Sequence, residues 1–120
     1  MIGLSRKVAV FACTRPVDMR KQFDSLAALV TQEMGGELLS GNVFLFVGKN
    51  RRRAKALYFD GTGLCVLAKR LEKGRFAALW PEHGGGAPVR LTPSELALFL
   101  EGSELVGKMA LSPSPLSIGR

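Results

Sequence analysis

Apolar positions along this chain follow first a strand pattern, then a helical one, and then a series of strand patterns. Residues 7–12 form a short, partly β-branched apolar run that ends at a Thr-Arg-Pro sequence, which predicts a strand followed by a turn. A helical pattern comes next, in which apolar residues recur at steps of three and four: Met19, Phe23, Leu26, Ala27, Val30 and Met34.

Both ends of this helix carry recognisable signals. Pro16 and Asp18 suit its first turn, because proline fits the first helical position and a carboxylate complements the positive end of the helix dipole. Arg20 and Asp24 are spaced to pair across one turn. Gly35-Gly36 is expected to end the helix.

Strand patterns dominate the middle of the chain. Val43–Val47 is apolar throughout, which predicts a central strand covered on both faces. Residues 54–59 and 63–71 are two further strand-like runs, and the strong turn sequence Asp60-Gly61-Thr62-Gly63 joins them. Residues 76–80 resemble one more strand.

The C-terminal part combines a short strand, a helix and a tail. Residues 89–91 suit a last short strand, and Thr92-Pro93-Ser94-Glu95 is a capping box with proline at the first helical position. Residues 107–120 contain serines and prolines with little periodicity, which predicts a flexible tail.

These elements predict an α+β fold. We expect a mainly antiparallel sheet of about five strands, with one helix from the N-terminal half of the chain and a C-terminal helix packed on it. A single domain is expected over residues 1–106, followed by the tail.

Composition fits a soluble globular domain, since 47% of the 120 residues are apolar and 22% are charged. Cys13 and Cys65 lie inside apolar runs, which favours buried, reduced thiols over a disulfide. No stretch approaches the ~18 consecutive apolar residues of a membrane span, and the N-terminal apolar run is too short for a signal peptide. We therefore expect a cytoplasmic protein without a membrane partner.

The net charge of +7 is concentrated in one segment of the chain. Residues 49–75 hold nine basic residues and only two acids, Asp60 and Glu72, so the rest of the chain sums to zero. The basic residues are Lys49, Arg51, Arg52, Arg53, Lys55, Lys69, Arg70, Lys73 and Arg75. Concentrated basic charge on a folded scaffold indicates a polyanionic partner, most often nucleic acid, although it also keeps small proteins soluble.

The nine basic residues fall into two pieces, each at a connection between strands. The first is the turn at residues 49–53, with Lys55 just inside the strand that follows, and the second is residues 69–75, at the next connection but one. Alternate connections of an antiparallel meander emerge at the same end of the sheet, so we expect both to face one partner. Arginines there can bind phosphate oxygens bidentately. Tyr58 and Phe59 offer stacking surfaces, but aromatics at strand positions more often belong to the core.

Motifs for catalysis or cofactor binding are incomplete. His83-Gly84-Gly85-Gly86 matches the oxyanion loop of some lipases, but no Gly-x-Ser-x-Gly elbow accompanies it, so a loop is expected. One histidine and two distant cysteines lack zinc spacing, and Asn42 stands where a phosphate loop requires lysine. We expect no catalytic residues, no metal and no cofactor.

Several segments resemble a family of bacterial transposon proteins. They are the runs at residues 16–21, 23–30, 57–65, 69–76 and 91–102, together with Gly48 and its basic turn. In that order they are similar to TnpB, the second-reading-frame accessory protein of insertion sequences of the sixty-six type. The resemblance covers roughly residues 5–102 and implies a role in transposition beside a separate protein that performs strand transfer.

The leading hypothesis is a non-catalytic accessory protein that contacts DNA through the two basic connections, within a complex with the transposase and other proteins of the same element. The alternative is an adaptor that binds the transposase, or a second copy of itself as a homo-oligomer, without touching DNA.

Overall fold

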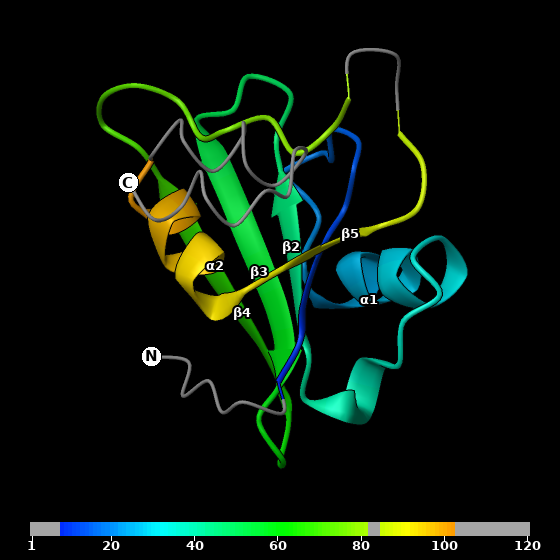
Figure 1. Ribbon diagram of the computed structural model, residues 1–120. Coiled ribbons are helices and arrows are strands. Elements are labelled where there is room, and N and C mark those ends of the chain that lie inside the picture. Colours follow the sequence, from blue (N-terminus) through cyan, green and yellow to red (C-terminus); the bar gives the residue numbers. More distant parts are fainter. Residues whose placement is uncertain (1–7, 82–84, 103–120) are drawn as a thin grey trace.

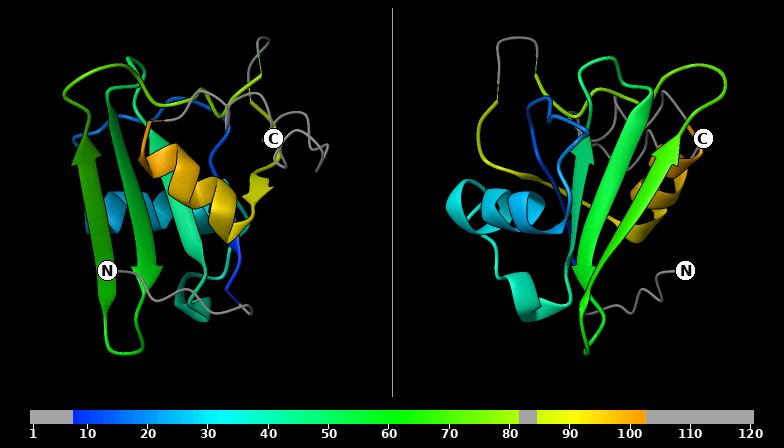
Figure 2. Two further views of the ribbon diagram at one scale, coloured as in Figure 1. Left: turned by 60° about the vertical axis from the view of Figure 1, so that its left-hand side comes forward. Right: turned by 180° about the vertical axis from the view of Figure 1, so that it is seen from behind.

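A five-stranded sheet in the order β4-β3-β2-β1-β5 forms the centre of the molecule (Figure 1). The computed structural model describes residues 8–81 and 85–102. Its elements are β1 (Val10–Ala12), α1 (Phe23–Gln32), the 3-10 helix η1 (Leu38–Ser40), β2 (Val43–Val47), β3 (Arg53–Phe59), β4 (Leu64–Arg70), β5 (Val89–Leu91) and α2 (Pro93–Leu100). Helix α1 covers one face of the sheet and α2 covers the other (Figure 2). The α+β class and the five strands are confirmed.

The sheet is mostly antiparallel, as expected, but it is mixed, because one of its four pairings is parallel. β1 pairs parallel with β2, with Val10 opposite Val43, whereas the other three pairings are antiparallel. The reason is the crossover through α1, because a strand, a helix and a second strand return the chain in the same direction. β5 then adds to the far side of β1.

The first helix begins later than its sequence signals predict. Residues 13–17 continue beside β2, where the amide of Cys13 donates to the carbonyl of Leu45 and that of Val17 donates to Val47, both at 2.9 Å. α1 then starts at Phe23, with Gln22 as its N-cap. Arg20 therefore lies before the helix and pairs with Asp18, so the expected pair with Asp24 is wrong.

Two hydrophobic clusters hold the layers together. On the α1 face, Phe44 and Phe46 of β2 and Leu57 of β3 pack against the helix. On the α2 face, Leu45 of β2 lies in the cluster that contains Phe99 of α2. All five residues of β2 are buried, which confirms a central strand covered on both sides.

Residues 76–80 form no strand, contrary to the prediction. Phe76 and Leu79 are nevertheless fully buried, and the Phe76 ring stacks on Phe99 with 4.8 Å between centroids. The segment is therefore apolar because it is buried beneath α2, and not because it pairs as a strand.

Local signals for turns and caps are confirmed. Asp60 accepts hydrogen bonds from the amides of Thr62 and Gly63 in the β3–β4 turn, and these bonds lower its pKa to about 2. Thr92 and Glu95 form the predicted capping box at the start of α2. Cys13 and Cys65 are free thiols; Cys13 is buried as expected, whereas Cys65 is only half-buried.

In residues 8–81 and 85–102, no helix is long and apolar enough to cross a bilayer. The expected tail at 107–120, together with Lys7, His83 and Gly84, lies outside the described residues.

Candidate nucleic-acid interface

The two basic connections emerge side by side at one end of the sheet. The amide of Leu71, just after β4, donates to the carbonyl of Arg52 at 2.9 Å, and the amide of Phe76 donates to Arg51 at 2.6 Å. The turn between β2 and β3 is thus tied directly to the connection that leaves β4, as expected for alternate connections of a meander.

Arg53 and Arg70 lie directly opposite each other on β3 and β4. The hydrogen bonds that flank the ladder, Leu71 to Arg52 and Asp60 to Gly63, make this a non-hydrogen-bonded pair. Side chains are closest in such pairs, at about 4.5 Å between Cα atoms, and like charges there are destabilising. Both side chains share the α1 face, since they have the same parity as Leu57 and Val66. The sheet therefore holds two guanidinium groups together at some cost.

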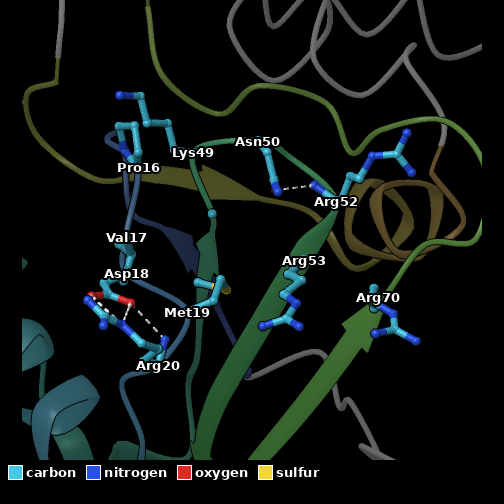
Figure 3. A pocket seen from close by; sticks show the side chains of 11 residues that line it. Pro16, Val17, Asp18, Met19, Arg20, Lys49, Asn50, Arg52, Arg53 and Arg70 are labelled. Atoms are coloured by element: carbon cyan, nitrogen blue, oxygen red, sulfur yellow. Dashed lines mark hydrogen bonds and ion pairs between the residues drawn. The ribbon is translucent and has the colours of Figure 1, made fainter.

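A third segment completes an open pocket around this pair (Figure 3). We call it the basic pocket; it has a volume of about 1000 Å³ and is lined by Pro16, Val17, Asp18, Met19, Arg20, Gly48, Lys49, Asn50, Arg52, Arg53 and Arg70. Five of these residues are basic and one is acidic. Its net positive charge comes from the β2–β3 turn, β3 and β4, because in the segment before α1 Asp18 balances the charge of Arg20.

Two small features shape the pocket. A Cβ on Gly48 would lie 2.8 Å from Cγ of Met19, so the glycine lets the segment before α1 approach the turn closely. Asn50 accepts a hydrogen bond from the amide of Arg52 at 2.9 Å, which fixes the turn that carries Arg52 and Lys49.

Asp18 orients Arg20 at the pocket wall. The Arg20 guanidinium donates to both carboxylate oxygens, with Nη2 2.7 Å from Oδ2, and the Arg20 amide also donates to Oδ1. These bonds, the guanidinium first, hold the pKa of Asp18 well below its usual range. The carboxylate is therefore ionised at neutral pH, and 89% of the Arg20 side chain still faces solvent.

A second pocket of about 610 Å³ adjoins the first and shares Met19, Arg20, Arg53 and Arg70 with it. Lys55 and Lys69 also line it. Lys55 is only 9% exposed, and its ammonium donates to the carbonyl of Lys21 at 2.7 Å. One role of Lys55 is thus to tie the segment before α1 to β3.

The predicted site residues divide into three groups. Lys49, Arg52, Arg53 and Arg70 meet in the basic pocket, and Lys55 and Lys69 line its neighbour. The Lys69 ammonium donates to the carbonyl of Leu100 at the end of α2, where a cation complements the helix dipole. Outside both pockets, on the adjoining connections, lie Arg51, Lys73 and Arg75.

Arg20 is the basic pocket residue that sequence reasoning missed. Its spacing predicts a helical pair with Asp24 only if the helix starts near Pro16, whereas α1 starts at Phe23. The available signal was the basic cluster Arg15, Arg20 and Lys21 around that proline.

Aromatic stacking has no place in the basic pocket, since no Phe, Tyr or Trp lines it. Tyr58 packs against the cluster beneath α2, and desolvation there raises its pKa. No group of three His, Cys, Asp or Glu residues converges as a metal site in the part of the chain that the structure describes. The pocket is thus equipped for anion binding through charge.

Arg51 adopts a left-handed backbone conformation, with φ of 60°. Such a conformation costs a residue other than glycine roughly 1–2 kcal/mol. We expect Arg51→Gly to raise the free energy of unfolding in urea by about 1 kcal/mol. Arg52→Gly is the control, because Arg52 has no positive φ and should lose stability. Equal free energies of unfolding for the two variants would show that the backbone of Arg51 is not strained.

The model of the family described as IS66 Orf2 like protein matches residues 8–109. The chain belongs to the IS66 Orf2-like family. Its members are insertion-sequence accessory proteins, which confirms the resemblance found in the sequence.

Two relatives of this family member come from Sinorhizobium fredii. The uncharacterized protein y4hO is 37% identical over 102 residues, which are 85% of this chain and 86% of that protein. The uncharacterized protein y4jC is 34% identical over 102 residues, which are 85% of each chain. No solved structure matches the chain.

Proposed function

We propose that this IS66 Orf2-like protein is a non-catalytic accessory protein of transposition that contacts DNA phosphates through the basic pocket. The observation that carries the proposal is that three basic residues, Arg20, Lys49 and Arg52, line the basic pocket around the opposed pair Arg53 and Arg70. A phosphate placed between the two guanidinium groups would replace their repulsion with charge-assisted hydrogen bonds.

Phosphate contact without base reading follows from the pocket's composition. Lysine and arginine side chains bind the backbone and fix position, whereas sequence is read at base edges or by shape. Because no aromatic side chain lines the pocket, stacking on bases adds nothing there. We therefore expect binding that depends weakly on sequence, with strand transfer performed by the transposase of the same element.

A fluorescence-anisotropy titration of labelled duplex DNA over a salt series tests the proposal. Wild-type protein should bind at low salt, and the affinity should fall steeply as salt rises, because each neutralised phosphate releases counterions. With four to five phosphate contacts, the logarithm of the affinity should fall against the logarithm of salt with a slope of about −4. Undetectable binding at low salt would refute DNA contact and leave the adaptor hypothesis.

A further inference from the structure

Lys55 of β3 is a buried cation that no carboxylate of the described residues balances. The residue is 9% exposed, and none of the ion pairs within residues 8–81 and 85–102 includes it. Its ammonium group has three N–H donors, of which the described chain occupies one through the carbonyl of Lys21. Burying a charge is costly unless the charge is paired, so this ammonium is suited to receive an anion.

The second pocket offers that anion a place. It is lined by Lys55 together with Arg20, Arg53 and Arg70, and Glu72 is the one acid in its lining. The side chain of Glu72 is 86% exposed, and its carboxylate lies 3.9 Å from Arg70, which is too far for a hydrogen bond. The lining of the second pocket therefore carries a net positive charge.

Two neighbouring rungs of the β3–β4 ladder lie along the two pockets. Arg53 is opposite Arg70, and Lys55 is opposite Ala68, an exposed residue whose small side chain leaves room for a ligand. Both rungs are non-hydrogen-bonded pairs on the α1 face, because the two kinds of pair alternate along the ladder. Residues two apart on a strand are separated by about 6.6 Å, which is close to the spacing of successive phosphates along an extended nucleic-acid strand.

We infer that the second pocket binds a phosphodiester group next to the one in the basic pocket, so that two successive phosphates of one polynucleotide strand bind along β3. The inference rests on the proposed function and adds to it a second binding site, which Lys55 anchors. Arg53 and Arg70 line both pockets, and each guanidinium group has five N–H donors. The pair can therefore bind both phosphates through charge-assisted hydrogen bonds.

Met19 suits the sugar that joins the two phosphates. It lines both pockets, and its thioether side chain is apolar and adaptable. A sugar between two phosphates presents C–H groups to such a side chain. The chemistry that the two pockets recognise together is thus a run of phosphodiesters, which single-stranded and duplex DNA both supply.

Ala68→Glu tests the second site, and Ala68→Gln serves as its uncharged match in size. The new carboxylate would face Lys55 across the ladder and occupy the place of the phosphate, which gives the buried ammonium a partner within the chain. In anisotropy titrations at low salt, Ala68→Glu should bind DNA about tenfold more weakly than Ala68→Gln. Its slope of log affinity against log salt should also be shallower by about one, for one lost phosphate contact.

Lys73→Gln controls for net charge, because it changes the charge by the same one unit at an exposed residue outside both pockets. Its affinity should stay within a few-fold of the wild type. Equal affinities of Ala68→Glu and Ala68→Gln, or an equal loss in Lys73→Gln, would overturn the second site. If the wild type binds no DNA at low salt, the proposed function fails as well, so the two failures are distinguishable.

Modified DNA tests the same inference on the wild-type protein, without any risk to its folding. Neutral methylphosphonates replace half of the phosphodiesters of a labelled thymidine strand, either at alternate positions or together in one block. The two strands carry equal charge, but only the block design keeps successive charged phosphates, and it should bind about tenfold more tightly. Equal affinities would refute the pairing of phosphates. A duplex with both strands modified alike forms the second arm, and the arm that shows the difference identifies the source of the phosphates.

Discussion

Replacing Arg53 and Arg70 together with glutamine is expected to weaken duplex DNA binding by about a hundredfold at low salt. A hydrogen bond to a charged group contributes about 1.5–3 kcal/mol, and each 1.4 kcal/mol corresponds to a factor of ten in affinity. The slope of log affinity against log salt should become shallower by about two, one for each lost phosphate contact. Anisotropy titrations of the variant and the wild type over the same salt series measure both effects.

The control variant is Lys73→Gln with Arg75→Gln. It removes the same charge from exposed residues of the neighbouring connection, which line neither pocket. Its affinity should stay within a few-fold of the wild type. Equal losses in the two double variants would mean that net charge, and not the basic pocket, governs binding.

Folding of the Arg53 and Arg70 variant is not expected to suffer. The two arginines are directly opposed like charges, which destabilise a sheet by a few tenths of a kcal/mol to about 1 kcal/mol. Urea unfolding of the glutamine variant should therefore give a free energy equal to or above that of the wild type. If the variant loses affinity for DNA but is at least as stable as the wild type, the loss of binding cannot be due to unfolding.

Phe76→Ala is expected to lower the free energy of unfolding by about 3–5 kcal/mol. Phe76 is fully buried, and its ring stacks on Phe99 of α2 with 15° between the planes. The substitution removes this contact and leaves a cavity between α2 and the sheet. A domain of this size is stable by about 5–15 kcal/mol, so the substitution should remove a large part of its stability.

Urea denaturation monitored by circular dichroism measures the Phe76→Ala effect. Leu39→Ala is the matched control, because Leu39 is a large apolar residue that is 65% exposed. Its free energy of unfolding should change by less than about 0.5 kcal/mol. A loss of less than 1 kcal/mol in Phe76→Ala would show that the segment under α2 does not belong to the core.

The sequence predicts well the elements whose signals are local. Val43–Val47 is apolar at every position, and the turn at Asp60 and the capping box at Thr92 each depend on residues within one short segment. The structure confirms all three. The family resemblance is also confirmed, because it relies on many segments in a fixed order.

Features decided by distant partners were harder to predict. Hydrogen bonds from Cys13 and Val17 to β2 delay the start of α1, and nothing near Pro16 indicates them. Burial under α2 makes residues 76–80 look like a strand, since a short apolar run does not distinguish a strand from buried coil. Four basic residues of the candidate site lie at or beside strand connections that the sequence indicates. Arg20 was not expected there, because the sequence places it inside the helix, whereas α1 begins only at Phe23.

The parallel pairing of β1 has a consequence for how the chain folds during synthesis. β2, β3 and β4 follow one another along the chain and pair through short turns, so they can form as soon as they leave the ribosome. β1 is made first, but Val10 pairs with Val43 on one side and with Leu91 on the other. The earliest strand therefore stays incompletely paired until nearly the whole domain has been translated, and its burial is the step that closes the sheet.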